Sequence, residues 1–141
     1  MAIEQIVPKT AHDRMTDSAD AATYLDVRTV EEYEAGHPAG AHNVPVMNRV
    51  DGQMTPNPHF AEEVQNRFGM TDRLVVGCMA GGRSQKACEI LQSAGFTRLA
   101  NVQGGFGGAR DASGQIAVKG WSQEGLPTES GRPAGRAYGK T

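Results

Sequence analysis

The chain has 141 residues, a formal net charge of -2 at pH 7 and a pI near 6.1. This length corresponds to about one domain, long enough to bury a real core. The nearly balanced charge gives no reason to expect nucleic acid or an anionic membrane as a partner, and no segment approaches the ~18 apolar residues of a transmembrane helix.

The first 23 residues mix acidic and basic side chains and contain no apolar core of a signal peptide, so we expect the chain to stay where it is made. Two cysteines, Cys78 and Cys88, are too few for a disulfide framework, and neither lies in a metal-ligand spacing. We therefore expect a reducing, cytoplasmic setting.

The first half of the chain shows short elements. Residues 3–20 carry only a weak helical pattern that places no element firmly. The run Tyr24–Val27 predicts a buried strand, and the segment Thr29 to Glu32 has the pattern of a capping box at the start of a brief helix. Ala41–Val44 predicts a second strand, which Pro45 closes.

Residues 57–105 carry longer sequence patterns. An apolar stripe with helical spacing predicts a helix that begins at Asn57-Pro58 and ends at Gly69. Leu74–Val76 predicts a strand, and residues 84–94 predict a helix with one apolar face. Leu99–Val102 predicts another strand, followed by a turn at Gly104-Gly105.

The pattern weakens beyond residue 106. Residues 107–120 predict a surface loop with a small strand at Ile116–Val118. Residues 131–141 contain Gly, Pro, Arg and Lys but almost nothing to pack, which predicts a mobile C-terminal tail. The expected organisation is one domain over residues 1–130, with an insert at about 106–120, and a tail over 131–141.

Strands that alternate with helices at this spacing predict βαβ units. The expected fold class is α/β, with a mostly parallel central sheet of about five strands and helices on both faces. In such sheets ligands bind beyond the carboxyl ends of the strands. Cys78 directly follows one predicted strand, so the fold class and the position of the candidate site agree.

The segment Cys78-Met79-Ala80-Gly81-Gly82-Arg83-Ser84 has the layout of a loop that stabilises a thiolate. Its glycines let successive backbone N–H groups turn inward, and the following helix adds its positive dipole end. Arg83 supplies a full positive charge. Because the thiolate is the nucleophilic form, these features predict a functional Cys78 rather than a packing cysteine. Cys88 lies one turn into the helix beside apolar residues, and we expect it to pack.

The size of this loop bears on its chemistry. Four residues separate Cys78 from Arg83, whereas cysteine-dependent phosphatases place one more residue in their loop and enclose a tetrahedral phosphate. A tighter ring of N–H donors suits a single extra sulfur atom. Such donors can stabilise the charge on the outer sulfur of a persulfide, as an oxyanion hole does. Covalent catalysis of this kind gives two displacements and ping-pong kinetics.

Further motifs occur in a fixed order along the chain. They are Tyr24-Leu25-Asp26-Val27-Arg28, Gly36-His37 through Pro45, Cys78 to Ser84, Gly104-Gly105, and Trp121 with Gly125-Leu126-Pro127. With these motifs the chain resembles a single-domain rhodanese, a sulfurtransferase, of the plant type and its bacterial relatives, over roughly Tyr24 to Glu129. One departure is the stretch Phe106 to Gly120, which separates the glycine pair from Trp121; it leaves the expected fold intact and the substrate preference open.

The resemblance implies a role for each matching residue. Cys78 would be the nucleophile that accepts a sulfane sulfur as a persulfide, and Arg83 would bind the anionic donor. Asp26 and Arg28 would form a supporting pair below the loop. The sulfur would be held by the backbone N–H groups of Met79, Ala80, Gly81, Gly82, Arg83 and Ser84. No metal, nucleotide or organic cofactor is implied.

The expected reaction moves sulfane sulfur from a donor such as thiosulfate to a thiophilic acceptor, which is cyanide in an assay and a thiol or a carrier protein in the cell. One alternative is a non-catalytic or persulfide-sensing rhodanese-like module; the retained Cys78, glycines and Arg83 favour the enzyme. The other alternative is a phosphatase or arsenate reductase. The loop length disfavours it, and so does Gly77, because phosphatases usually carry histidine at that position.

Overall fold

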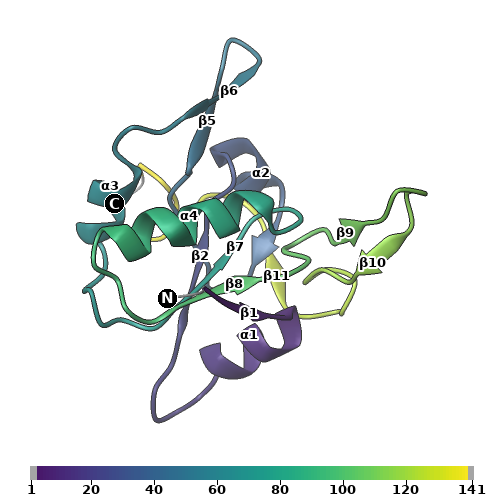
Figure 1. Cartoon of the computed structure of the whole chain (residues 1–141), viewed down its shortest axis with the longest axis horizontal. Helices are drawn as coiled ribbons and strands as arrows, with labels where there is room; N and C mark the ends of the chain where they lie inside the picture. The colour runs from purple at the N-terminus through teal and green to yellow at the C-terminus, as the bar shows by residue number, and fades with distance from the viewer. Residues whose placement is uncertain (1–2, 140–141) are drawn as a thin grey trace.

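The structure is a computed structural model that describes residues 3–139 (Figure 1). At its centre lies a five-stranded sheet in the order β1-β8-β7-β2-β4, and every neighbouring pair is parallel. The strands are β1 (Glu4–Ile6), β8 (Leu99–Val102), β7 (Leu74–Gly77), β2 (Thr23–Asp26) and β4 (His42–Asn43). The predicted α/β class with a parallel sheet is confirmed.

Helices cover both faces of the sheet. Neighbouring residues of a strand point to opposite faces, so Leu74 and Val76 enter one apolar cluster while Val75 enters the other. The first cluster holds buried residues of α3 (Phe60–Gln65) and α4 (Gly82–Ser93). The second holds residues of α1 (Pro8–Met15) and α2 (Val30–Ala35). None of the helices formed by residues 3–139 has the length and hydropathy to cross a membrane.

The start of α2 follows its predicted capping box. The N–H of Glu32 donates to Thr29 Oγ1 at 3.3 Å, and the N–H of Thr29 donates to Glu32 Oε1 at 3.1 Å. These two bonds satisfy donors that a helix start otherwise leaves without partners. They also fix the Glu32 side chain near the carboxyl end of β2.

Two hairpins project from the body (Figure 1). The first pairs β5 (Met47–Val50) with β6 (Gln53–Pro56), and the second pairs β9 (Ala109–Arg110) with β10 (Ile116–Val118). One follows β4 and the other follows β8, so they leave the carboxyl edge of the sheet on opposite sides of β7. The strand predicted at Ile116–Val118 is confirmed and gains β9 as its partner. A further short pair joins β3 (His37–Pro38) to β11 (Thr128–Glu129).

The N-terminal region contains two elements that the sequence pattern did not place. β1 is an edge strand of three residues, of which only Ile6 is buried, so it carries too few apolar positions for a periodic signal. α1 follows it directly, with Pro8 in its first turn, where a missing N–H costs nothing. The fifth strand of the sheet is therefore this edge strand.

The C-terminal segment packs more than its composition suggests. Ala137 is buried, and Tyr138 lies against the cluster under α3 with its hydroxyl donating to Glu63 Oε2 at 2.5 Å. The expectation of almost nothing to pack is wrong at these two positions. Residues 140 and 141 of the expected tail lie outside the described residues, and the boundary at 130 and the mobility of the tail stay predictions.

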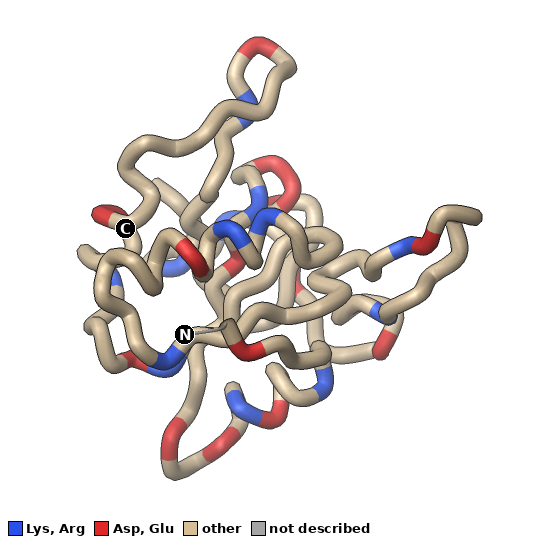
Figure 2. The backbone as a smooth tube through the Cα atoms, in the orientation of Figure 1, with Lys and Arg blue, Asp and Glu red and all other residues tan. Residues whose placement is uncertain are grey.

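Acidic and basic residues are interspersed along residues 3–139 (Figure 2). Several form ion pairs that join elements distant in sequence, among them Arg98 with Asp20 and Arg136 with Glu129. The mixed pattern follows from a nearly even count of 14 basic and 16 acidic residues.

Candidate active site

Cys78 lies at the carboxyl end of β7, the central strand, with only 2% of its surface exposed. The backbone N–H of Gly81 donates to its sulfur at 3.0 Å. Gly81 has φ +124°, a conformation that side chains disfavour, and it serves as the N-cap of α4. The helix begins at Gly82, two residues earlier than predicted, so its first N–H groups and positive dipole end face the sulfur side of the loop.

The glycine turn after β8 is hydrogen-bonded to the carbonyl groups of this loop. Three of its N–H groups donate to three successive carbonyl oxygens of the loop. The bonds run from Phe106, Gly107 and Gly104 to Cys78, Met79 and Ala80, at 2.8, 2.9 and 3.2 Å. The sequence analysis predicted a turn at Gly104-Gly105 but did not predict its hydrogen bonds to the loop.

Ser84 brings a hydroxyl next to the sulfur from the first turn of α4. Its Oγ lies 3.4 Å from Cys78 Sγ and 2.5 Å from Asn101 Oδ1, and the side chain is buried. Asn101, on β8, was not among the predicted site residues. The signal that could have found it is a polar residue within an otherwise apolar strand, because a buried amide needs a partner.

Arg83 does not stand free. Its Nη1 and Nη2 donate to Oε1 and Oε2 of Glu32 at 2.7 and 3.0 Å, a two-point ion pair across 51 positions of sequence. The sequence predicted a full positive charge at Arg83, and in the structure the Glu32 carboxylate pairs with that charge. Burial raises the pKa of Glu32, but the bonds from Arg83 and Thr29 outweigh it and lower that pKa to about 2.

This ion pair predicts a contribution to acid stability. A carboxyl whose pKa is lower in the folded chain stabilises the fold above its ordinary value of 4.5, and that contribution disappears as the pH falls towards about 2. We expect Glu32→Gln, which keeps the capping geometry, to lose less stability than the wild type between pH 4.5 and 2. Urea unfolding at stepped pH measures this. Glu31→Gln, on the exposed face of the same helix, should follow the wild-type curve.

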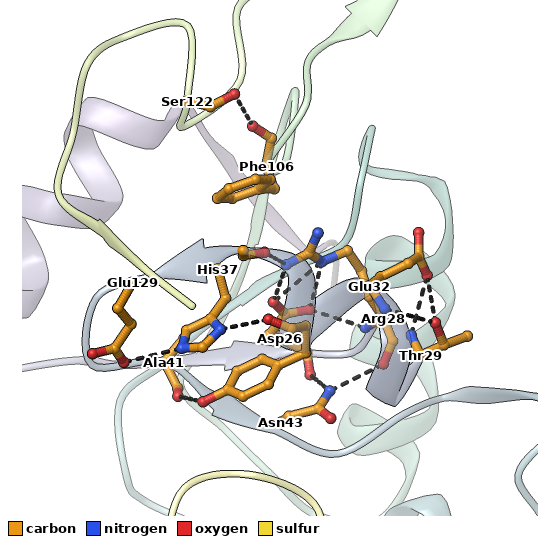
Figure 3. Close-up of polar contacts among 12 residues, drawn as sticks. Asp26, Arg28, Thr29, Glu32, His37, Ala41, Asn43, Phe106, Ser122 and Glu129 are labelled. Carbon is orange, nitrogen blue, oxygen red and sulfur yellow. Dashed lines mark hydrogen bonds and ion pairs between the residues drawn. The ribbon is translucent and has the colours of Figure 1, made fainter. Parts of the chain in front are cut away.

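Asp26 and Arg28 form a buried pair next to the loop, each 1% exposed (Figure 3). Arg28 Nη2 donates to Asp26 Oδ2 and to the carbonyl of Gly36, both at 2.7 Å. The ring of Phe106 covers the guanidinium at 4.6 Å. Because the N–H of Phe106 donates to the Cys78 carbonyl oxygen and its ring packs on Arg28, the pair supports the turn that holds the loop.

Tyr24 lies beneath the last residue of β7. A Cβ atom on Gly77 would lie 1.9 Å from the Tyr24 hydroxyl oxygen, so no side chain fits there. Burial, together with the charge of Asp26, raises the pKa of Tyr24 well above its ordinary value of 10.0. The hydroxyl therefore stays protonated, and the ring occupies the space that a residue other than glycine would need at position 77.

Cys88 is fully buried in the cluster under α4. Burial, with smaller effects from Glu89 and Cys78, raises its pKa to about 12, which keeps it a thiol at neutral pH. This agrees with the predicted packing role. Across residues 3–139, no three His, Cys, Asp or Glu side chains gather as metal ligands would.

The predicted insert lies beside the loop. Ala109 of β9 and Val118 of β10 line a cavity of about 400 Å³ together with Ala80 and Gly81 of the loop. The hairpin therefore borders the active-site loop on the side of β8.

Three comparisons with known proteins bear on this geometry. The family model of the rhodanese-like domain matches residues 7–112. Thiosulfate sulfurtransferase 16, chloroplastic, of Arabidopsis thaliana is 42% identical over 135 residues, which cover 92% of this chain and 100% of that protein. The crystal structure of Rv0390 from M. tuberculosis superimposes with a TM-score of 0.76 at 30% identity, covering 93% of this chain and 100% of the other.

A further relative is longer than this chain. Rhodanese-like domain-containing protein 15, chloroplastic, of Arabidopsis thaliana is 39% identical over 106 residues, 75% of this chain. The match spans 52% of that protein. The comparisons thus cover whole single-domain proteins and about half of this longer one.

Proposed function

The chain belongs to the rhodanese-like domain family, and from this premise we propose that it is a sulfurtransferase that works through a persulfide on Cys78. The donor is thiosulfate or a similar sulfane sulfur compound, and the acceptor is a thiophilic nucleophile. The family and a relative named as a thiosulfate sulfurtransferase support sulfur transfer in general. We also propose a reducing, cytoplasmic setting, although both plant relatives are named chloroplastic.

One observation carries the proposal: the sulfur of Cys78 accepts an N–H bond from Gly81 at 3.0 Å at the start of α4. Backbone donors and a helix N-terminus favour negative charge at that point. In this proposal the N–H groups of Met79 to Ser84 stabilise the charged outer sulfur.

The reaction consists of two displacements. The Cys78 thiolate attacks the outer sulfur of thiosulfate, an S–S bond to Cys78 forms, and the S–S bond of the donor breaks as sulfite leaves with the electron pair. Cyanide or an acceptor thiolate then attacks the outer sulfur of the persulfide. Thiocyanate or an acceptor persulfide leaves, and the Cys78 thiolate returns.

The intact mass of the purified protein tests this function. We expect a gain of one sulfur atom after thiosulfate and its removal by cyanide. A protein that gains no sulfur from thiosulfate, or from a mercaptopyruvate-like donor, would instead fit the non-catalytic or persulfide-sensing module. A phosphatase is disfavoured further because Tyr24 leaves no space for a side chain at Gly77.

Glu32 is expected to weaken donor binding by competing for Arg83. Releasing the guanidinium with Glu32→Gln should lower KM for thiosulfate about two- to fivefold with kcat unchanged, the size of a partly exposed ion pair. Arg83→Ala should raise KM on the order of tenfold, since a hydrogen bond to a charged group is lost. Steady-state thiocyanate formation measures both, and Glu31→Gln is the matched control. Equal KM values in wild type and Glu32→Gln would contradict the competition.

A further inference from the structure

We propose that Asn101 is a positioning residue that decides which way the Ser84 hydroxyl hydrogen points, and thereby how readily Cys78 becomes a thiolate. The inference deepens the proposed function and rests on Cys78 as its nucleophile. It concerns a residue on β8 that makes no contact with the sulfur itself and acts through Ser84.

The contacts of the Ser84 hydroxyl carry the argument. Its oxygen lies 2.5 Å from Asn101 Oδ1, 3.1 Å from the carbonyl oxygen of Gly81 and 3.4 Å from Cys78 Sγ. A hydroxyl has one hydrogen, so it can donate to only one of these acceptors, and the shortest contact is with Asn101. Towards Cys78 the oxygen then presents lone pairs, which can accept the S–H of a thiol and cannot stabilise a thiolate.

A chain of amides explains why the oxygen of Asn101 faces Ser84. Asn101 Nδ2 donates to Gln5 Oε1 at 2.8 Å, Gln5 Nε2 donates to Gln85 Oε1 at 2.6 Å, and Gln85 Nε2 donates to Glu89 Oε2 at 3.1 Å. The carboxylate of Glu89 can only accept. Every donor in the chain therefore points towards Glu89, and the carbonyl end of Asn101 is left for Ser84.

The arrangement works against the charged sulfur in the resting protein. When the Cys78 proton leaves to solvent, the Ser84 hydroxyl has to turn from Asn101 to the sulfur, and one short hydrogen bond is exchanged for a longer one. The same turn recurs in each cycle, because the second displacement returns Cys78 as a thiolate. Asn101 thus sets the balance between thiol and thiolate without touching substrate.

Other ionisable groups also act on Cys78, and they stay unchanged in the test below. Arg83 and Cys88 of α4 and Tyr24 of β2 lie close enough to Cys78 for charges to interact. Glu32 of α2 lies behind Arg83, and Asp26 acts on both Tyr24 and Arg83. Asn101 is uncharged, so replacing it leaves these charges in place. A shift in the pH profile of Cys78 therefore reports a change in the direction of the Ser84 hydroxyl.

The test is the pH profile of Cys78 alkylation by iodoacetamide, followed by peptide mass. We expect Asn101→Leu to free the hydroxyl for the sulfur, to move the profile to lower pH and to raise the rate at neutral pH about three- to tenfold, the factor that one hydrogen bond is worth. In a Ser84→Ala background, Asn101→Leu should leave the pH profile and the alkylation rate unchanged. Gln103→Ala, which lines the neighbouring cavity outside the chain of amides, is the control.

An unchanged profile in Asn101→Leu, or an equal shift in the Ser84→Ala background, would overturn the proposal. If Asn101→Leu does not fold, Gln5→Ala replaces it at an exposed position. That variant lets the Asn101 amide turn over and should shift the profile in the same direction; no shift would equally overturn the proposal. Alkylation needs no sulfur donor, so failure of the proposed function leaves this measurement intact.

Discussion

We expect Cys78→Ser to abolish sulfur transfer, with the rate of thiocyanate formation from thiosulfate and cyanide falling by at least about 10³-fold, as loss of a catalytic nucleophile does. A serine hydroxyl at neutral pH is a weak nucleophile and cannot form a persulfide, so the first displacement has no attacking group. The fold should persist, because the replacement is nearly the same size at a position where Gly81 and Ser84 already offer polar contacts.

Cys88→Ala is the matched control for this variant. Cys88 is the other cysteine of the chain, and burial keeps it a thiol. We expect this variant to retain transfer and the gain of one sulfur atom in its intact mass. Retained turnover in Cys78→Ser, or loss of it in Cys88→Ala alone, would assign the chemistry to a different residue.

Gly105→Ala should cause a large loss of stability. The residue has φ +51°, and a Cβ there would lie 2.2 Å from the Cys78 carbonyl oxygen and 2.8 Å from the Met79 carbonyl oxygen. These neighbours are backbone atoms and cannot turn aside. The left-handed conformation and the overpacking together should cost about 2–5 kcal/mol, which lowers Tm by about 6 to 20 °C in a domain of this size.

Activity should fall as well in Gly105→Ala, because the turn holds the carbonyl side of the active-site loop. Thermal unfolding and thiocyanate formation at a temperature below both transitions separate the two effects. Gly69→Ala is the control: its Cβ would meet Asp72 at 3.7 Å, an ordinary contact, at a surface position. A Gly105→Ala protein as stable as the control would show that the loop and the turn are not packed as described.

The site was predictable to the extent that its parts are adjacent in sequence. Cys78 to Ser84 forms one continuous loop, and its strand, glycines and following helix can be recognised from local pattern alone. The capping box at Thr29 and Glu32 is local in the same way, and the structure confirms it. The hairpin β5–β6 also had a local signal, the Asp51-Gly52 pair with positive φ at both residues, which the sequence analysis did not use.

Local sequence patterns predict the alternation of strands and helices, the parallel sheet and the candidate loop at the end of a central strand, because each depends on periodicity and turn residues within a short window. The surroundings of the sulfur, by contrast, depend on contacts between residues that are distant in sequence. Strand order brings Asn101 to Ser84, Glu32 to Arg83 and Tyr24 beneath Gly77. These pairs depend on strand register and on which elements are neighbours in space. The sequence around a side chain does not specify a partner that lies far away in the chain.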